Sequence, residues 1–225
     1  MRITLESVFS QSAALCEDLV NQVQTGRKLS TLVGYAVLSG AFYGATMGLS
    51  HSALQAGASA IKVPMLFLLT LAICLPSLHF LGLLFGATIR FQQTAGVLSA
   101  GLCRTSILLS AFAPISLFFL MSGSDYPFLL LMHVGVFTVC GAGGLVTIFQ
   151  DFSQVRLQMA QAEQRSIPRS VLYAWMLLYM FVGTQMAFNL APFVNRPGDA
   201  VALFNQGQGN FYSYLWDVIA EWMQR

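Results

Sequence analysis

Long apolar segments separated by short polar ones dominate the pattern of this chain. Within residues 29–150 the only formally charged side chains are those of Lys62, Arg90, Arg104 and Asp125. A domain folded in water needs a wetted outer surface, whereas a charge near the bilayer centre costs roughly 2.5–3.5 kcal/mol on insertion scales. The pattern therefore predicts an integral membrane protein.

The apolar runs are long enough to define individual membrane spans. A spanning helix needs about 20 apolar residues, and five runs fit: 31–50, 63–86, 102–121, 127–149 and 170–191. The second run opens at Pro64, where a proline in the first helical turn costs nothing. We therefore predict an all-α, polytopic membrane helix bundle with about five transmembrane helices, whose transmembrane domain covers 31–193.

The segments on either side of the bundle have the period of amphipathic helices. In the N-terminal segment, 1–30, one face carries Leu5, Val8, Phe9, Leu15, Leu19 and Val23, which predicts a cytoplasmic helix lying on the membrane or on a partner. In the tail, 194–225, an apolar stripe carries Phe211, Leu215, Val218, Ile219 and Trp222, with Tyr212, Tyr214 and Trp216 beside it. This stripe predicts an interfacial helix. Residues 150–165 are expected to continue the fourth helix into the cytoplasm.

The basic residues set the orientation. With the N-terminus inside, the cytoplasmic segments hold Arg2, Arg27, Lys28, Arg90, Arg104, Arg156, Arg165 and Arg169, and the outer segments hold Lys62, Arg196 and Arg225. This asymmetry favours a cytoplasmic N-terminus and an extracytoplasmic C-terminus. The first residues lack the apolar core of a cleavable signal, so we expect the first span to direct insertion.

Composition narrows the classes of partner. The chain is 56% hydrophobic and 9% charged, against about 25% charged in soluble domains, and its mean hydropathy is +0.67. The net charge of +2 and the lack of any basic run longer than two residues argue against a nucleic-acid partner. The cysteines, Cys16, Cys74, Cys103 and Cys140, are widely spaced, which favours packed thiols over metal ligation or disulfides.

A ladder of small residues marks one face of the first span. Ala36, Gly40, Gly44 and Gly48 recur every four residues, so another backbone can approach closely along that face. We favour packing against another helix of the same chain; self-association or contact with a partner subunit is the alternative.

Prolines and charged residues inside or beside the spans are candidates for helix kinks and for membrane anchors. Pro76 and Pro114 are expected to kink the second and third spans, as packing features or, alternatively, beside a gate. We favour Arg104 as a headgroup anchor, but a span that starts at Gly96 would bury it and make it functional. Four further residues are predicted to be lipid-interface anchors, namely Lys62, Arg90, Trp216 and Trp222.

The remaining polar residues give a weak candidate site. Gln185 and Asn189 share a face of the fifth span, and His79 lies in the second. These three could bind a polar ligand, although hydrogen bonds between helices are the commoner use of such residues. His51 and His133 have no carboxylate at helical spacing.

The sequence also lacks acidic residues in its spans and the motifs of common enzymes. None of the predicted spans contains Asp or Glu, and no hydrolase, metalloprotease or phosphate-loop motif occurs. Ser77 and His79 lie two positions apart and do not share a helix face. We therefore expect no enzymatic activity, no metal and no cofactor.

Several stretches resemble a known family. The run from Ile61 to Gly86, the preceding SGAFYGATMGLSH, and the later APISLFF, FVGTQMAFNLAPFVNRPG and GNFY are similar to a family of uncharacterised bacterial multi-pass proteins of the inner membrane. The pattern of five spans with Lys-x-Pro opening the second also resembles, more loosely, the Yip1-type membrane fold. The resemblance implies a fold and a bacterial inner-membrane location, and no catalytic residue.

Three functional hypotheses follow from these features. The first is an accessory or assembly subunit of a larger membrane complex, which associates with other membrane proteins or with itself. The second is a small uncoupled transporter or channel for a neutral or anionic solute, with a path near Arg104, His79 and Gln185. The third is a Yip1-like protein that handles lipid or organises the membrane.

Overall fold

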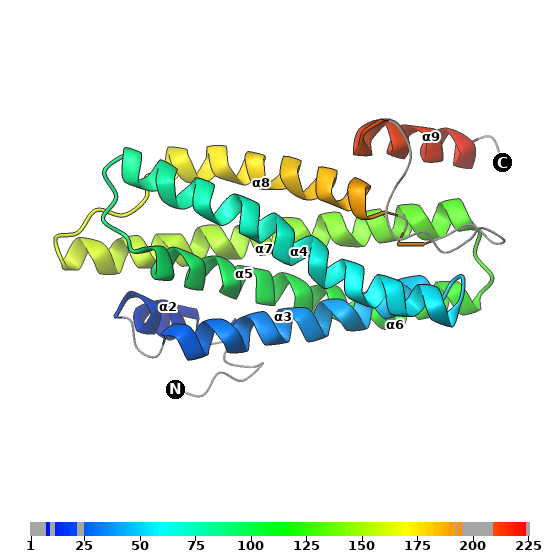
Figure 1. Cartoon of the computed structure of the whole chain (residues 1–225), viewed down its shortest axis with the longest axis horizontal. Coiled ribbons are helices and arrows are strands. Elements are labelled where there is room, and N and C mark those ends of the chain that lie inside the picture. Colours follow the sequence, from blue (N-terminus) through cyan, green and yellow to red (C-terminus); the bar gives the residue numbers. More distant parts are fainter. Residues whose placement is uncertain (1–7, 10–11, 22–24, 192, 195–208, 224–225) are drawn as a thin grey trace.

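The chain folds into a bundle of long helices that run side by side in the computed structural model (Figure 1). The structure describes residues 8–9, 12–21, 25–191, 193–194 and 209–223, without the side chains of Ser12, Ala13, Val20, Glu221 and Trp222. All regular secondary structure in these ranges is helical. The predicted all-α membrane bundle is confirmed.

Eight helices are described within those ranges. In chain order they are α2 Ser12–Val20, α3 Thr25–Gly48, α4 Ala53–Leu84, α5 Phe91–Ala111, α6 Ala113–Met121, α7 Tyr126–Gln161, α8 Arg169–Leu190 and α9 Phe211–Met223. At a rise of about 1.5 Å per residue, α7 is longer than the hydrocarbon core of a bilayer. Its last turns therefore extend beyond the span predicted for 127–149, as expected from the sequence.

Among the described residues, four helical segments are long and apolar enough to cross a membrane. These are α4, the α5–α6 pair, α7 and α8. Helix α3, which contains most of the predicted first span, is not among them. It packs along α4 and α5, and the glycine, serine, threonine and tyrosine residues within 31–48 lower its apolar content. A fifth span therefore stays a prediction.

Two helices begin earlier than their apolar runs. Ser52 caps α4, because its hydroxyl accepts a hydrogen bond from the Gln55 N–H at 3.2 Å, and Pro64 consequently lies inside the helix. The Arg90 N–H donates to Gln93 Oε1 at 2.8 Å and starts α5 at Phe91. Both helices therefore extend ahead of the spans predicted from 63 and 102, because their caps lie in polar sequence before the apolar runs, and Pro64 is not in the first turn of α4.

The two interior prolines behave differently. Pro114 lies in the first turn of α6, and the chain leaves regular helix at Phe112 between α5 and α6. The helix of the third span is therefore interrupted at this position, where a kink was expected. Helix α4 passes through Pro76 as one continuous helix, so Pro76 does not interrupt it.

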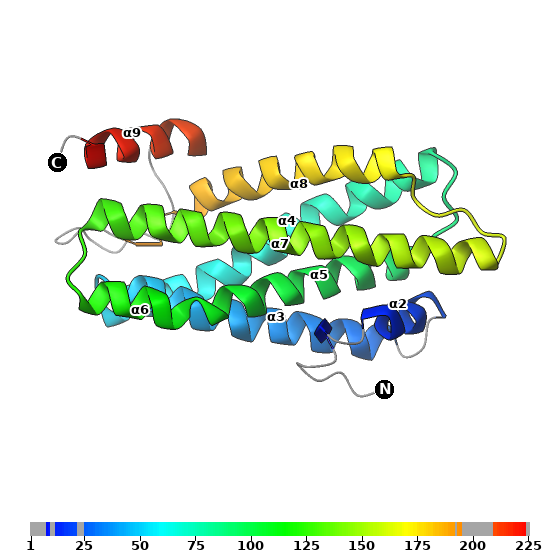
Figure 2. The same ribbon diagram turned by 180° about the vertical axis from the view of Figure 1, so that it is seen from behind.

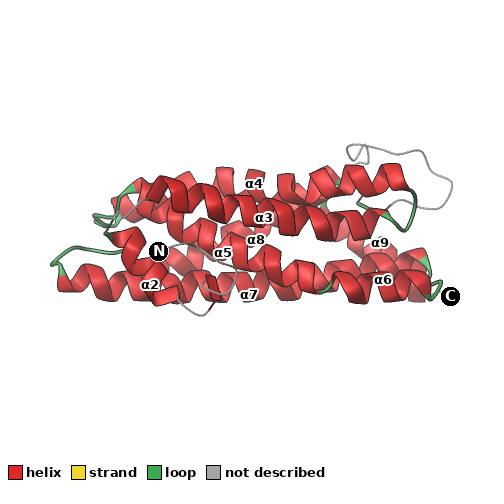
Figure 3. Ribbon diagram, turned by 90° about the horizontal axis from the view of Figure 1, so that it is seen from below, coloured by secondary structure: helices red, strands yellow, loops and turns green. Residues whose placement is uncertain are grey.

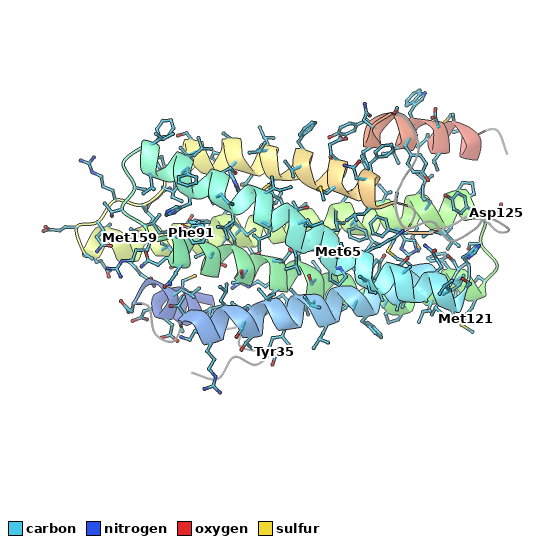
Figure 4. The ribbon with its side chains drawn as sticks, viewed as in Figure 1. Tyr35, Met65, Phe91, Met121, Asp125 and Met159 are labelled. Atoms are coloured by element: carbon cyan, nitrogen blue, oxygen red, sulfur yellow. The ribbon has the colours of Figure 1, made fainter. Side chains whose placement is uncertain are left out.

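The bundle has two chemically distinct ends. At the basic end, α3 and α5 begin close to the loop that joins α7 to α8, and this end carries Arg27, Arg90, Arg165 and Arg169 (Figures 1 and 2). At the α9 end, a short loop connects α6 to α7, and α8 ends below α9 (Figure 1). Figure 4 shows Met159 at the basic end, and Met121 and Asp125 at the α9 end.

The N-terminal helix packs on the bundle. In Figure 3, α2 lies beside α7 near the start of α3. Leu15 and Leu19 of α2 are buried, and a Cβ added to Gly96 of α5 would lie 2.6 Å from a methyl of Leu19. Lys28 and Asp18 form an ion pair that joins α3 to α2. The predicted apolar face therefore docks on the same chain, although Phe9 is half exposed; Leu5 and Val23 lie outside the described residues.

Candidate functional site: a cleft between α7 and α8

A cleft of about 340 Å³ lies between α7 and α8. Helices α4 and α5 form its floor, with Phe67 and Leu102 among the lining residues, and α9 contributes Phe211, Tyr214 and Leu215 at one end. Its volume falls at the lower end of the range for small-molecule sites.

The packing of the helices explains why the cleft exists. Helix α7 packs mainly against α5, and α8 packs mainly against α4, so neither wall rests on the other along its length. The walls also carry small residues. A Cβ added to Gly141 of α7 would meet nothing within 4 Å, and one added to Gly183 of α8 would meet only a methyl of Thr70. These glycines leave room that larger side chains would fill.

Aromatic contacts join the walls toward both ends of the cleft. Toward the basic end, the rings of Phe149 on α7 and Tyr173 on α8 stack with centroids 5.1 Å apart. At the α9 end, the hydroxyls of Tyr126 and Tyr214 are 3.2 Å apart, and the rings of Phe188 and Tyr214 have centroids 6.2 Å apart. The open space therefore lies in the middle part of the two helices.

The mouth of the cleft is also near the middle of the helices. Among the lining residues, Thr138 and Ala142 of α7 are exposed, and Met180 of α8 is 52% exposed. All three lie well inside the predicted spans 127–149 and 170–191. In a membrane these residues face hydrocarbon, so a molecule would enter sideways from the bilayer.

The lining is apolar and uncharged. None of the described residues that line the cleft is Lys, Arg, Asp or Glu. Its histidine, His133, is only 3% exposed and shares a 2.8 Å hydrogen bond with the Tyr43 hydroxyl of α3. This bond holds the imidazole against α3, behind the cleft.

Arg104 lies inside the protein, and the prediction that it anchors to headgroups was wrong. Its guanidinium forms an ion pair with Asp151 of α7, and its Nε–H donates to the Val8 carbonyl at 2.8 Å. The Cys16 thiol donates to the backbone carbonyl of Asp151 at 3.9 Å. Arg104 thus joins α5, α7 and the N-terminal segment, because a carboxylate at the same depth was available to pair with it.

Lys62 is also placed differently from the prediction. Its side chain is only 4% exposed within α4, so it does not lie free at an outer headgroup layer. One turn earlier, the Ser59 hydroxyl donates to the Phe193 carbonyl at 2.6 Å, and Gln55 Nε2 donates to the same oxygen at 3.2 Å. Gln55, Ser59 and Lys62 therefore form a buried polar face of α4. These residues precede the apolar run that begins at 63, so the pattern of that run did not predict the face.

The small-residue ladder packs against α4. Ala36, Gly40, Gly44 and Gly48 are all buried. A Cβ on Gly44 would overlap the Ser59 carbonyl group, with its carbon 2.8 Å away, and one on Gly48 would lie 2.5 Å from the Ala56 Cα. The packing within the chain that we favoured is confirmed, and this face is not free for another subunit.

The weak candidate polar site does not form. His79 is buried toward the basic end of α4, with its ring 5.3 Å from that of Phe91. Asn189 lies one residue from the α9 end of α8, and Gln185 lies one turn before it. Residues at opposite ends of the bundle cannot share one site. Neither His79, Gln185 nor Arg104 lines the cleft.

The other predicted residues can be placed briefly. Arg90 is exposed at the start of α5, and Trp216 is 71% exposed on α9, so their role as lipid anchors stays a prediction. The side chain of Trp222 lies outside the described residues. The four cysteines are free and buried, which confirms that they are packed thiols.

Comparisons with protein-family models, with curated proteins and with solved structures find no match to this chain. The family resemblance of the sequence therefore stays a prediction, and the function must be argued from the cleft itself.

Proposed function

We propose that this protein is a non-enzymatic multi-pass membrane protein that binds an uncharged, membrane-soluble molecule in the α7–α8 cleft. The observation that carries the proposal is the position of the cleft mouth, at Thr138, Ala142 and Met180, midway along two membrane-length helices. This proposal develops the lipid-handling hypothesis and places it at a defined site.

The size of the cleft favours a slender occupant. A helix with its side chains is about 10–12 Å wide, which is too bulky for a cavity of about 340 Å³. A lipid chain fits such a space, and its transfer from the bilayer requires no desolvation of charge. The described part of the lining carries no charge, which disfavours an ionic group inside the cleft.

The proposal is tested by the lipid that copurifies with the protein. Gly141→Phe places a ring in the open space of the cleft, whereas Gly135→Phe adds the same ring to α7 at a position that is exposed, does not line the cleft and has nothing within 4 Å. After purification in a mild detergent, we expect wild type and Gly135→Phe to retain the same stoichiometric lipid and Gly141→Phe to lose at least four-fifths of it. Equal lipid content in all three proteins would overturn the proposal.

An accessory role in a larger complex is the second candidate. It is favoured by α9, which lies outside the main bundle and exposes Tyr212 and Trp216. For either role we propose that the basic end faces the cytoplasm, because Arg27, Arg90, Arg165 and Arg169 lie there and basic residues favour the cytoplasmic side. Copurification of a stoichiometric membrane protein that Trp216→Ala releases would support the accessory role, and a free monomer would count against it.

The transporter hypothesis receives less support. Its proposed path required Arg104, His79 and Gln185 to line one passage, and the cleft contains none of them. Arg104 is paired with Asp151 and is therefore not available to a solute anion.

A further inference from the structure

We propose that the molecule held in the cleft is a long-chain alcohol, an uncharged lipid whose hydroxyl group donates a hydrogen bond to the threonines of the cleft. This inference rests on the proposed function and adds the chemical class of the ligand. It follows from how the polar atoms of the lining are already bonded.

Four threonines line the cleft, one from each of its four main helices, and all have their hydroxyl protons in use. Thr70 donates to the Leu66 carbonyl at 2.7 Å and Thr105 donates to the Gly101 carbonyl at 3.0 Å. In the walls, Thr138 donates to the Val134 carbonyl at 2.8 Å and Thr184 donates to the Phe181 carbonyl at 2.9 Å. Each of these acceptors lies three or four residues earlier in the same helix. The Thr184 hydroxyl also lies 3.4 Å from the Tyr212 hydroxyl, and either atom can be the donor.

A hydroxyl that has donated its proton still has lone pairs. The threonines therefore keep acceptor lone pairs, although the Thr105 oxygen is packed against Gly144 of α7, where an added Cβ would lie 1.8 Å from it. A ligand that only accepts hydrogen bonds, such as an ester or an ether, gains little from threonines whose protons are already in use. A ligand with a donor gains more, since a hydrogen bond in an apolar site is not weakened by competing water. Ammonium donors are excluded because no carboxylate lines the cleft among the described residues. The donor is therefore uncharged, and the hydroxyl is the simplest such group on a lipid.

Thr138 is the best placed to accept this bond, and Thr184, whose hydroxyl is shared with that of Tyr212, is the second. They come from the facing walls α7 and α8, and both are more accessible than Thr70, which is only 2% exposed. Beyond them the floor offers apolar side chains such as Phe67 and Leu102. The alcohol group therefore lies at the mouth, and the chain extends over the floor.

The test uses photoreactive lipids in vesicles that contain the purified full-length chain. The probes are a long-chain alcohol, a diacylglycerol, the hydrocarbon of the same chain length, and a phosphatidylglycerol. We expect peptides of α7 and α8 to be labelled at least fivefold more by one of the two hydroxyl-bearing probes than by the hydrocarbon or the anionic lipid. The hydroxyl probe that labels more strongly distinguishes a single-chain alcohol from a diacylglycerol.

Matched variants separate this inference from the proposed function. Thr138→Val and Thr184→Val keep the side-chain shape and remove the acceptor, whereas Thr147→Val changes a threonine of α7 that also bonds to its own helix, at 2.8 Å, but does not line the cleft. We expect the first two to reduce the preference for the alcohol over the hydrocarbon at least threefold and Thr147→Val to preserve it. Equal labelling by alcohol and hydrocarbon, or a preference unchanged in the cleft variants, would overturn the inference while leaving an apolar ligand in place. No labelling of α7 and α8 by any probe would overturn the proposed function, and the inference with it.

Discussion

Arg104 of α5 and Asp151 of α7 form an ion pair in which the two side chains are 4% and 3% exposed. Neither helix could bury its own charge alone, because an isolated buried charge costs several kcal/mol. The pair therefore fixes α5 and α7 at one register and holds the Val8 carbonyl against the guanidinium.

Removing one partner of this pair is expected to destabilise the protein strongly. Arg104→Gln or Asp151→Asn leaves an uncompensated buried group and should cost about 3–5 kcal/mol. The double variant Arg104→Met/Asp151→Leu should recover most of that loss, since it removes both charges together. Unfolding in detergent measures the effect, with the exposed Arg169→Gln as a control expected to change by less than about 0.5 kcal/mol. Single variants as stable as the control would contradict a buried pair.

Close packing of α3 on α4 predicts a steric effect at the ladder. Gly44→Ala places a methyl group into the Ser59 backbone, which cannot move as a side-chain end can, and should cost about 1–3 kcal/mol. Gly34→Ala is the matched control, because an added Cβ there meets nothing within 4 Å, and it should be neutral or stabilising. The thermal midpoints of the two variants in the same detergent give the comparison. A smaller effect at Gly44 than at Gly34 would rule out the contact.

The Cys16 thiol should report whether the N-terminal segment is docked. Burial, with a smaller contribution from the Asp151 charge, raises the pKa of Cys16 from 9.0 to about 12. Because the folded pKa exceeds the unfolded value, the neutral thiol favours the folded state below pH 9, and this stabilisation is lost as the pH rises toward 12.

In a variant whose only cysteine is Cys16, we therefore expect negligible maleimide labelling at pH 8. Asp151→Asn should release the segment and restore labelling. A cysteine introduced at the exposed Ser30 gives the rate for a free thiol. Native Cys16 that reacts at that rate would show that the segment is not docked.

The orientation can be tested with the same chemistry. Ser122 and Gln164 are exposed at opposite ends of the bundle, and the native cysteines are buried, so background labelling should be low. A membrane-impermeant maleimide should label Ser122→Cys in intact cells and should label Gln164→Cys only after permeabilisation. The reverse result would place the basic end outside.

The sequence predicted the helices well because run length and charge are properties of the chain itself. The positions of Arg104 and Asp151 relative to the predicted spans also indicate that the two residues can pair, although the prediction for Arg104 was a headgroup anchor. Arg104 lies two residues after the start of the predicted span 102–121, and Asp151 lies two residues after the end of 127–149. In antiparallel neighbours these positions lie on opposite sides of the same membrane boundary, about 6 Å apart in depth. A long arginine side chain spans that distance, so the pairing could have been predicted.

The cleft was harder to foresee. Gly141 and Gly183 look like other small residues of membrane helices, and only the packing of α7 on α5 and of α8 on α4 leaves space between them. The same limit applies to Lys62 and His79, whose burial depends on neighbours far away in the chain. Contacts between helices of a membrane bundle leave little trace in periodicity, because lipid-facing and protein-facing residues are equally apolar.

The most direct measurement is the density inside the cleft, in a structure of the full chain in lipid nanodiscs with a bound antibody fragment for alignment. We predict an elongated density between Gly141 and Gly183 that ends at Thr138 and Thr184 and is lost in Gly141→Phe. A cleft filled by protein, through closure of α8 onto α7 or insertion of another segment, would contradict the account.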